Sequence, residues 1–441
     1  MSRNDMPAVP RRGVEVAQVL LLASVVAALL VSSVPAIAGG NTAGSLVQGA
    51  VAPRSFATTG TTSPLPTAPS WYSSVQNAAP SPRYGSAMAY DPSENVVVLF
   101  GGASNPPSGG VTVYGDTWVY ESGLWVNLTS SLRVAPSPRF DAAFAYDPVD
   151  GYLVLFGGGG VGSVALGDTW IFQGMQWTQL TPTVSPPALG GGTMTYDAQT
   201  GTLLFFGGGS SGTFSAETWT FSGGQWTQVP TTGPVPNARA SVGMTYDAAD
   251  GYAVLFGGWN GTVRFNDTWA YRAGAWSQLS PTTHPSPRLS YEIVYDPAIA
   301  KVVLFGGKYI GNFYNDTWTF QGGQWTDISA SLGGAPFNRA DESLTYLPAA
   351  GAVMMFGGQT FFPASLSDTW FFGTLATPSS SPTAGNNSTT PGSSSVDLGS
   401  SSFLVGLGAG LVVGGAIAAT ALLVGFRRRG KPAPPGSPPS Q

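Results

Sequence analysis

The feature that most constrains the fold of this chain is a unit of about 50 residues that occurs six times. Each unit has a hydrophobic run that ends in a Gly-Gly pair, and the pairs begin at Gly101, Gly157, Gly207, Gly257, Gly306 and Gly357. The successive pairs lie 56, 50, 50, 49 and 51 residues apart. Each pair is followed by Asp-Thr-Trp, or by Glu-Thr-Trp in the third unit, and the tryptophans are Trp118, Trp170, Trp219, Trp269, Trp318 and Trp370.

Residues 239–279 show how many strands one unit contains. The unit reads as a strand rich in small residues ("RASVGMTY"), a buried strand ("YAVLFGG"), a third strand ("DTWAY") and a fourth ("AWSQL"). Asp-Gly and Ala-Gly turns separate the first strand from the second and the third from the fourth. Four antiparallel strands make one blade, so six units predict an all-β, six-bladed β-propeller.

Other positions recur in register with the glycine pairs. A second tryptophan follows the first by seven residues in five units, and a tyrosine lies seven residues after an arginine in five units, with Leu189 replacing the arginine in the third. The sixth unit lacks its second tryptophan. Trp71 lies in "SWYSSVQNAAPSPR", which matches "LWVNLTSSLRVAPSPR", so we expect the N-terminal segment to supply the outer strand of the last blade. The alternative is that Trp71 is a linker residue.

The order of hydrophobic run, Gly-Gly, spacer, Asp-Thr-Trp and second Trp resembles the Kelch repeat, and the match covers about residues 71–373. This resemblance implies a Kelch-type propeller. It says little about activity, because Kelch propellers serve in binding, in scaffolding and in catalysis.

Two apolar segments outside the repeats predict a surface protein anchored in a membrane. Residues 1–38 have arginines, an apolar run and an Ala-x-Ala site, which indicates a secretory signal peptide cleaved after Ala38, or else an uncleaved signal anchor. Residues 403–426 carry no charge and are long enough for a transmembrane helix. The basic, proline-rich residues 427–441 would then be cytoplasmic and the propeller extracellular. Residues 39–70 are expected to be a flexible segment, and residues 374–402 a Ser/Thr/Pro/Gly stalk.

Composition excludes several classes of function. The chain has no cysteine and one histidine, so thiol chemistry is excluded and we expect no metal site and no cofactor. Residues 39–402 contain 11 Lys and Arg but 21 Asp and Glu, a net charge of −10, which disfavours nucleic acid as a partner. No nucleophile elbow, zinc motif or phosphate-binding loop is present.

Binding residues are expected on one face of the propeller. Antiparallel order places the second-to-third loops and the connections between blades together, and these loops are long and varied, whereas the turns at the other end are short. We call these two ends the long-loop face and the short-turn face. Variable loops on a rigid frame are common binding sites. The candidates on the long-loop face are Trp259, Arg264, Lys308, Tyr309, Phe361 and Phe362. Packing against a neighbouring blade is the alternative for the aromatic ones, and is expected for Phe265 and Tyr314.

The arginine series lies near the channel mouth on the same face, and two roles are open for it. Arg83, Arg139, Arg239, Arg288 and Arg339 could bind a carboxylate-bearing ligand. Their regular recurrence favours the other role, in which each arginine holds the aspartate of Asp-Thr-Trp. Four acids, Asp141, Glu292, Asp341 and Glu342, lie on the same inner strands.

The sequence therefore predicts a surface-anchored, non-catalytic module that binds an extracellular protein or glycan through the long-loop face. The alternatives are a glycan-processing enzyme that uses channel-mouth carboxylates, discriminated by two acids at catalytic separation, and a structural component of the cell envelope. Glycosylation sequons occur at several asparagines, and the candidate sites are Asn127, Asn260, Asn386 and Asn387.

Overall fold

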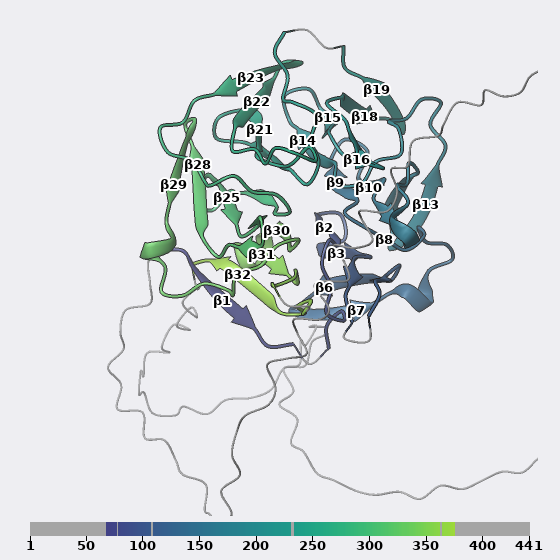
Figure 1. The fold of residues 1–441 in the computed structure, drawn as a ribbon. Coiled ribbons are helices and arrows are strands. Elements are labelled where there is room, and N and C mark those ends of the chain that lie inside the picture. Colours follow the sequence, from purple (N-terminus) through teal and green to yellow (C-terminus); the bar gives the residue numbers. More distant parts are fainter. Residues whose placement is uncertain (1–67, 77, 107–108, 231–232, 362–363, 375–441) are drawn as a thin grey trace, which may run out of the picture. The chain divides into compact units, whose positions relative to one another are not determined.

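Six four-stranded antiparallel sheets are arranged in a ring around a central channel (Figure 1). The computed structural model describes residues 68–76, 78–106, 109–230, 233–361 and 364–374. The predicted signal peptide, stalk and transmembrane helix therefore lie outside the described residues. Within those residues, no helix has the length and apolar character needed to cross a membrane.

Each blade contains one repeat, counted from the first glycine pair, and the strands run from the channel outward. Blade 1 comprises β2 (Ala87–Asp91), β3 (Val96–Phe100), β6 (Thr117–Glu121) and β7 (Leu124–Asn127). Blade 2 comprises β9 (Ala143–Asp147), β10 (Tyr152–Phe156), β12 (Thr169–Gln173) and β13 (Gln176–Leu180). Blade 3 comprises β14 (Thr193–Asp197), β15 (Thr202–Phe206), β18 (Thr218–Ser222) and β19 (Gln225–Gln228). Blade 4 comprises β20 (Gly243–Asp247), β21 (Tyr252–Phe256), β22 (Thr268–Arg272) and β23 (Ala275–Leu279). Blade 5 comprises β24 (Ile293–Asp296), β25 (Lys301–Phe305), β28 (Thr317–Gln321) and β29 (Gln324–Asp327). Blade 6 comprises β30 (Ser343–Leu347), β31 (Ala352–Phe356), β32 (Thr369–Gly373) and β1 (Ser70–Ser74).

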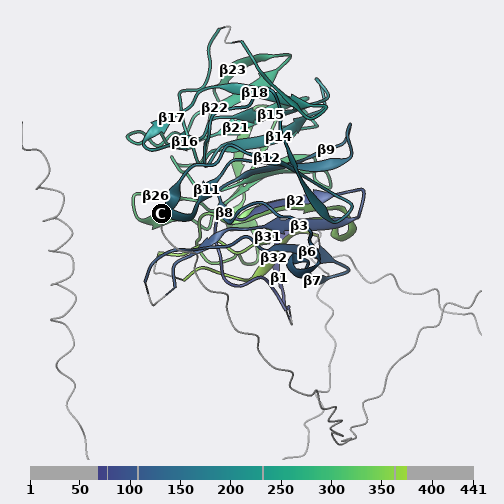
Figure 2. The ribbon, with the colours of Figure 1, turned by 90° about the vertical axis from the view of Figure 1, so that its right-hand side faces the viewer.

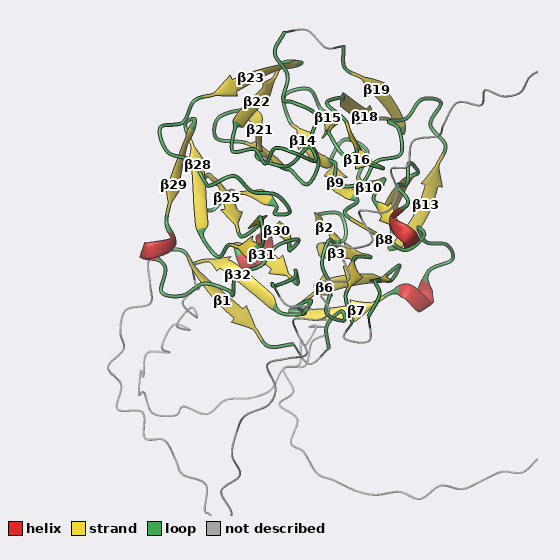
Figure 3. Cartoon of the chain, viewed as in Figure 1, coloured by secondary structure: helices red, strands yellow, loops and turns green. Residues whose placement is uncertain are grey.

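The long-loop face carries additional short pairs of strands. In the side view of Figure 2, β11, β16, β17 and β26 lie on the same side of the ring. The pairs are β4 (Ala103–Ser104) with β5 (Thr112–Val113), β8 (Arg139–Phe140) with β11 (Gly159–Gly160), β16 (Gly209–Ser210) with β17 (Thr213–Phe214), and β26 (Lys308–Tyr309) with β27 (Asn312–Phe313). Strands dominate the described chain (Figure 3), and short 3-10 helices lie at Thr129–Ser131, Val161–Ser163, Ser329–Ser331 and Pro348–Ala350.

The last blade is closed by the N-terminal strand, as the sequence predicts. Strand β1 pairs with β32, and Trp71 lies opposite Phe372. The indole of Trp71 is buried, and its N–H donates to Thr317 Oγ1 of blade 5 at 3.0 Å. Trp71 is therefore a core residue of blade 6, and β1 gives this blade the same four strands as the other five.

The core consists of six apolar clusters, one between each pair of adjacent blades. The second strand of each blade is apolar on both faces because neighbouring blades cover both of them, and the five residues of β3 are all buried. Outer strands are half exposed and turn one tryptophan inward, as Trp125 does in β7. This difference explains why the second strands read as continuous hydrophobic runs.

The threonine of each Asp-Thr-Trp triplet links its blade to the next one. In every blade the outer tryptophan donates its indole N–H to the threonine of the preceding blade, at 2.9–3.1 Å. The pairs are Trp71–Thr317, Trp125–Thr369, Trp177–Thr117, Trp226–Thr169, Trp276–Thr218 and Trp325–Thr268. The two recurrent motifs are therefore the two halves of one closed ring of hydrogen bonds between blades.

The first glycine of each pair is required by the approach of the next blade. Gly101 has a φ of +65°, and a Cβ on it would lie 2.4 Å from the carbonyl oxygen of Arg139 in blade 2. Any side chain there would push the blades apart.

Candidate functional site

The central channel contains a cavity of about 410 Å³ that is lined by the inner strands of all six blades. Its two ends differ in chemistry. The recurrent tyrosines line the end at the short-turn face, and each of them also packs against the preceding blade. They are Tyr90, Tyr146, Tyr196, Tyr246, Tyr295 and Tyr346.

The other end, which we call the channel mouth, is bounded by a closed ring of backbone hydrogen bonds. The residue two positions after the arginine position donates its N–H to the carbonyl of the equivalent residue in the preceding blade, at 2.7–3.0 Å. All six residues have a left-handed φ between 52° and 68°, although four of them are not glycine. Such backbone is tolerated best by glycine and by short polar residues. The six are Gly85, Asp141, Gly191, Ser241, Ser290 and Asp341.

The acids noted in the sequence meet at this mouth. Asp141 and Asp341 belong to the ring itself and lie on either side of Gly85, and a Cβ on Gly85 would lie 2.4 Å from Asp141 Oδ1. Glu292 lines the cavity, and its Oε2 accepts the backbone N–H of Leu344 at 2.6 Å. Residues of three blades are therefore brought together by the closure of the ring.

One cation compensates part of this charge. Lys308 Nζ lies 2.8 Å from Asp341 Oδ2, and Gln359 Nε2 donates to the same oxygen at 2.5 Å. The carboxylate of Asp141 accepts no hydrogen bond from any described residue. Both carboxyl oxygens of Glu342, which is 2% exposed, are buried with no hydrogen-bond partner in the described part of the chain. The mouth is thus acidic and only partly neutralised.

Burial shifts the protonation of these acids. Burial and the neighbouring Asp341 raise the pKa of Asp141 to about 7. Burial raises the pKa of Glu292 to about 8, although its hydrogen bond from Leu344 works in the other direction. The pKa of Glu342 is also raised well above its ordinary value, chiefly by burial. At neutral pH the mouth therefore holds protons that a bound cation would displace.

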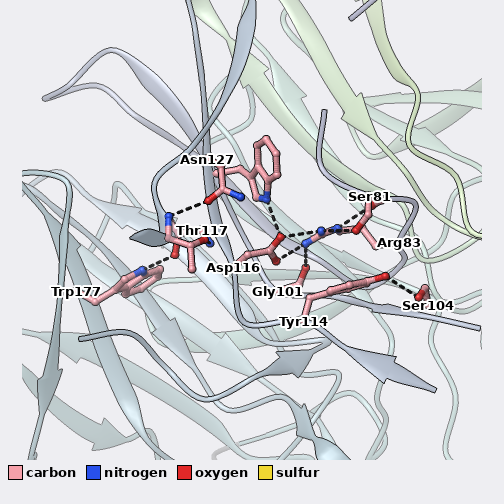
Figure 4. A network of polar contacts seen from close by, with 11 residues as sticks. Ser81, Arg83, Gly101, Ser104, Tyr114, Asp116, Thr117, Asn127 and Trp177 are labelled. Atoms are coloured by element: carbon pink, nitrogen blue, oxygen red, sulfur yellow. Dashed lines mark hydrogen bonds and ion pairs between the residues drawn. The ribbon is translucent and has the colours of Figure 1, made fainter. Parts of the chain in front are cut away.

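The five arginines have the structural role that their regular spacing favours. Arg83 Nη1 and Nη2 bind the two carboxylate oxygens of Asp116 at 2.6 and 2.9 Å, and Nη1 also donates to the carbonyl of Gly101 (Figure 4). The ring of Tyr114 lies 4.2 Å from the guanidinium carbon. With its bonds to Ser81, all five N–H donors of Arg83 are used. The same bidentate pair forms in the other four blades that carry the arginine: Arg139–Asp168, Arg239–Asp267, Arg288–Asp316 and Arg339–Asp368.

These Arg–Asp clamps leave no guanidinium for a ligand. The five arginines are at most 1% exposed, so their interpretation as ligand-binding residues is replaced by a structural one. Burial works to raise the pKa of Asp116, but the hydrogen bonds and charge of Arg83 outweigh it, and the pKa lies below its ordinary value. The pKa values of Asp168 and Asp368 are lowered for the same reason.

Blade 3 shows what replaces a clamp. Leu189 takes the arginine position and is buried, and the triplet has Glu217 in place of aspartate. Glu217 accepts the indole N–H of Trp219 at 3.0 Å, as the aspartates do in the other blades. Arginine and aspartate are thus replaced together, which avoids an unpaired buried charge.

The structure brings some of the candidate binding residues on the long-loop face into contact with one another. The guanidinium carbon of Arg264 lies 5.8 Å from the ring centroid of Trp259 and 5.6 Å from that of Tyr309 in the next blade. Phe214 of blade 3 meets Trp259 edge-on at 5.4 Å. Phe361 is 62% exposed and contacts Phe313, with ring centroids 6.4 Å apart. Lys308 lies at the channel mouth, and Phe362 lies outside the described residues.

Phe265 and Tyr314, expected to pack against a neighbouring blade, instead lie over the arginine of their own blade. The guanidinium carbons of Arg239 and Arg288 lie 3.9 and 4.3 Å from the two ring centroids. Two of the glycosylation candidates are described. Asn127 and Asn260 each accept backbone N–H groups through Oδ1, in turns that leave the asparagine at the surface or partly exposed. Asn386 and Asn387 lie outside the described residues.

A smaller hollow on the long-loop face was not recognised in the sequence. In each blade the residue after the arginine position pairs with the residue that directly follows the glycine pair, and in blade 3 both are glycine, Gly190 and Gly209. No side chain fills this position, and a cavity of about 240 Å³ remains between Phe140, Phe214 and Trp259. Aligning these two positions across the repeats would have revealed the double glycine.

The comparisons with known proteins agree with this geometry. The chain matches the model of the KLHDC2/KLHL20/DRC7 Kelch-repeats domain over residues 66–246, 173–358 and 221–406. The chain belongs to the Kelch-repeat family. The matched segments overlap and begin about two repeats and then one repeat apart, which is expected for a repeated unit. No curated protein matches the chain. Kelch propellers are typically protein-binding modules and are usually non-catalytic.

Proposed function

We propose that this Kelch propeller is a non-catalytic receptor at the cell surface that binds an extracellular protein through its long-loop face. The observation that carries the proposal is the cluster in which Arg264 lies between Trp259 and Tyr309, across blades 4 and 5. Large aromatic side chains and arginine are the residues most enriched among energetically important interface contacts.

Exposed apolar residues extend this surface. Val263, Ile310 and Phe361 are 47%, 64% and 62% exposed, and all lie in second-to-third loops of blades 4 to 6. The indole N–H of Trp259 and Nε of Arg264 are buried with no hydrogen-bond partner among the described residues. Because both donors are enclosed, the support for a role in recognition comes from the exposed apolar side chains of this surface.

The binding test uses the purified full-length chain. It would be captured on a sensor and exposed to cell-envelope protein and to a glycan array, beside a variant with Trp259→Ala, Tyr309→Ala and Phe361→Ala. The matched control, Leu124→Ala with Val149→Ala, removes exposed apolar side chains from the short-turn face. Saturable protein binding that only the triple variant loses supports the proposal. Binding lost equally in the control contradicts it, and absence of any binding favours a structural envelope role.

The location is a separate part of the proposal. It rests on the apolar segments 1–38 and 403–426 and on the arginines that follow the second. A fluorescent protein fused after residue 441 is expected to be cytoplasmic, while protease added outside intact cells removes the propeller. Resistance of the propeller to external protease in intact cells, with cleavage after lysis, would place it inside instead.

A further inference from the structure

A row of aromatic side chains on the long-loop face is interrupted at blade 3. In blades 1, 2 and 4, one of the two paired positions beside the arginine and the glycine pair carries an aromatic residue: Tyr84, Phe140 or Trp259. The ring of Phe140 lies over its partner, because a Cβ on Gly159 would lie 2.8 Å from Phe140 Cζ. The ring centroids of Tyr84 and Phe140 are 6.4 Å apart. Blade 3 has glycine at both positions, so the repeat places a ring there in its neighbours and none in blade 3.

The interruption leaves an open hollow. Its lining of about 240 Å³ includes the rings of Phe140, Phe214 and Trp259 and the backbone of Gly190 and Gly209. The two glycines bond to each other through both N–H groups, at 2.9 and 3.0 Å, so this part of the lining demands no hydrogen bond from an occupant. All three rings are only partly buried, and the loop tips beside them are exposed. A side chain can therefore enter from the solvent.

The chemistry of the lining favours a neutral ring. Phe214 meets Trp259 edge-on, with ring centroids 5.4 Å apart, and aromatic side chains gain most from such edge-on and offset contacts with other rings. The lining residues include one acid, Asp141, and neither lysine nor arginine, so the hollow does not suit an anion. The same kind of side chain fills the equivalent place in the two adjacent blades.

We propose that the blade 3 hollow receives an aromatic side chain of the partner protein, which takes the place that Phe140 and Trp259 hold in blades 2 and 4. This inference rests on the proposed function and deepens it. Trp259 lines the hollow and also belongs to the cluster with Arg264 and Tyr309, so a partner bound to that cluster reaches the hollow. A single buried aromatic anchor surrounded by weaker contacts is a common arrangement in protein interfaces.

The surroundings of the hollow leave it accessible to a partner. Val161 and Val164, in the adjacent loop of blade 2, are 70% and 63% exposed and extend the apolar surface on that side. The described chain begins and ends on the opposite face, because Ser70 pairs with Gly373 and Gly373 with Ala352, which follows a short turn. Figure 2 shows β16 and β17, which border the hollow, on the long-loop side of the ring.

The first experiment uses a probe that needs no partner. Nα-acetyl-phenylalanine N-methylamide would be titrated into the purified full-length chain by saturation-transfer NMR, beside the leucine and alanine analogues. We expect a Kd on the order of 1 mM for the phenylalanine analogue. Binding of the leucine analogue should be roughly three- to tenfold weaker, because leucine makes no contacts between rings. Equal binding of the two analogues, or no saturable binding, overturns the proposal.

A variant that fills the hollow localises the site. Gly190→Phe supplies within the chain the ring that Phe140 supplies in blade 2. Gly190 does not have a left-handed φ, and a Cβ there would lie 3.3 Å from Gly158 C and Gly159 N, so a small shift accommodates it. The variant should keep its Tm and bind the phenylalanine analogue at least about tenfold more weakly. Leu289→Phe, which adds the same ring at the equivalent position of blade 5, is the matched control and should change the Kd less than about twofold.

A second variant decides the matter if Gly190→Phe does not fold. Phe140→Ala removes one wall of the hollow and should weaken binding of the phenylalanine analogue at least about threefold. A folded Gly190→Phe chain that binds like the wild type contradicts the assignment. So does an unchanged Kd in Phe140→Ala, or an equal loss of binding in Leu289→Phe.

The two proposals fail separately. If a protein partner binds the long-loop face and Gly190→Phe does not weaken it, the function stands and the aromatic site is wrong. If the phenylalanine analogue binds in the hollow but no protein partner is captured, the site stands without the proposed function.

Discussion

Arg139 and Asp141 are two residues apart in the segment that precedes β9 of blade 2. The charge of Arg139 is paired, whereas the carboxylate of Asp141 is paired with no described residue. Arg139 is 1% exposed and bound to both oxygens of Asp168, whereas the carboxylate of Asp141 has no hydrogen-bond partner among the described residues. The same contrast separates Arg339 from Asp341, whose one cationic partner among the described residues, Lys308, is in another blade. The clamp recurs in five blades and maintains the fold. The ring acids occur in two blades, and departures of this kind from the repeat are where a site can be built.

The largest loss of stability is expected when the ion pair of a clamp is broken. Arg139→Leu leaves Asp168 half-buried without its cation, and the free energy of unfolding should fall by about 3–5 kcal/mol in a urea titration. Asp141→Asn, two residues away, removes a buried carboxylate that accepts no hydrogen bond from the described residues, so the free energy of unfolding should stay the same or rise.

A double variant tests why blade 3 lacks the clamp. Arg139→Leu with Asp168→Glu reproduces the natural combination of Leu189 and Glu217. It should recover part of the loss, because the longer carboxylate can reach solvent while it still accepts from Trp170. If the double variant is less stable than Arg139→Leu alone, the two substitutions in blade 3 are not compensatory.

The second test concerns pH, and it follows from the ring acids. The pKa of Asp141 is raised to about 7 and that of Glu292 to about 8. Groups with a raised folded-state pKa contribute stability that is complete below the unfolded pKa, near 4, and is lost as pH rises through the folded value. The clamp aspartates act in reverse, and their contribution is lost only as pH falls below about 4. The Tm should therefore be highest near pH 5 and fall by roughly 5–10 °C by pH 8.

Glu292→Gln is the control for this pH profile. Glutamine keeps an oxygen for the N–H of Leu344 and cannot ionise. The variant should match the wild type near pH 5 and exceed its Tm above pH 7. A wild-type Tm that rises between pH 5 and 8, or a variant that is no more stable at pH 8, would show that ionisation of these acids does not destabilise the fold.

The repeat made most of the fold predictable from sequence. Six blades, the closure by Trp71 and the clamp all follow from positions that recur, because register fixes which recurrent side chains meet. The contacts of Lys308 could not be predicted in this way. Its partner Asp341 comes from another blade and from a position that is glycine or serine in most of the others, so the pair depends on loop geometry and side-chain direction. The hollow beside Gly190 was missed because it is defined by absent side chains.

A smaller loss of stability than at the clamps is expected at the ring of tryptophan–threonine hydrogen bonds, because these bonds join neutral groups. Thr268→Val removes the acceptor of Trp325 within the continuous chain, and Thr317→Val removes that of Trp71 at the closing strand. Each leaves a buried indole N–H without a partner and should cost about 1–2 kcal/mol in urea unfolding. Because both bonds are 3.0 Å long and both tryptophans are buried, the two costs should agree. A much smaller cost for Thr317→Val would mean that β1 is held by its strand pairing and that the closing tryptophan is not equivalent to the others.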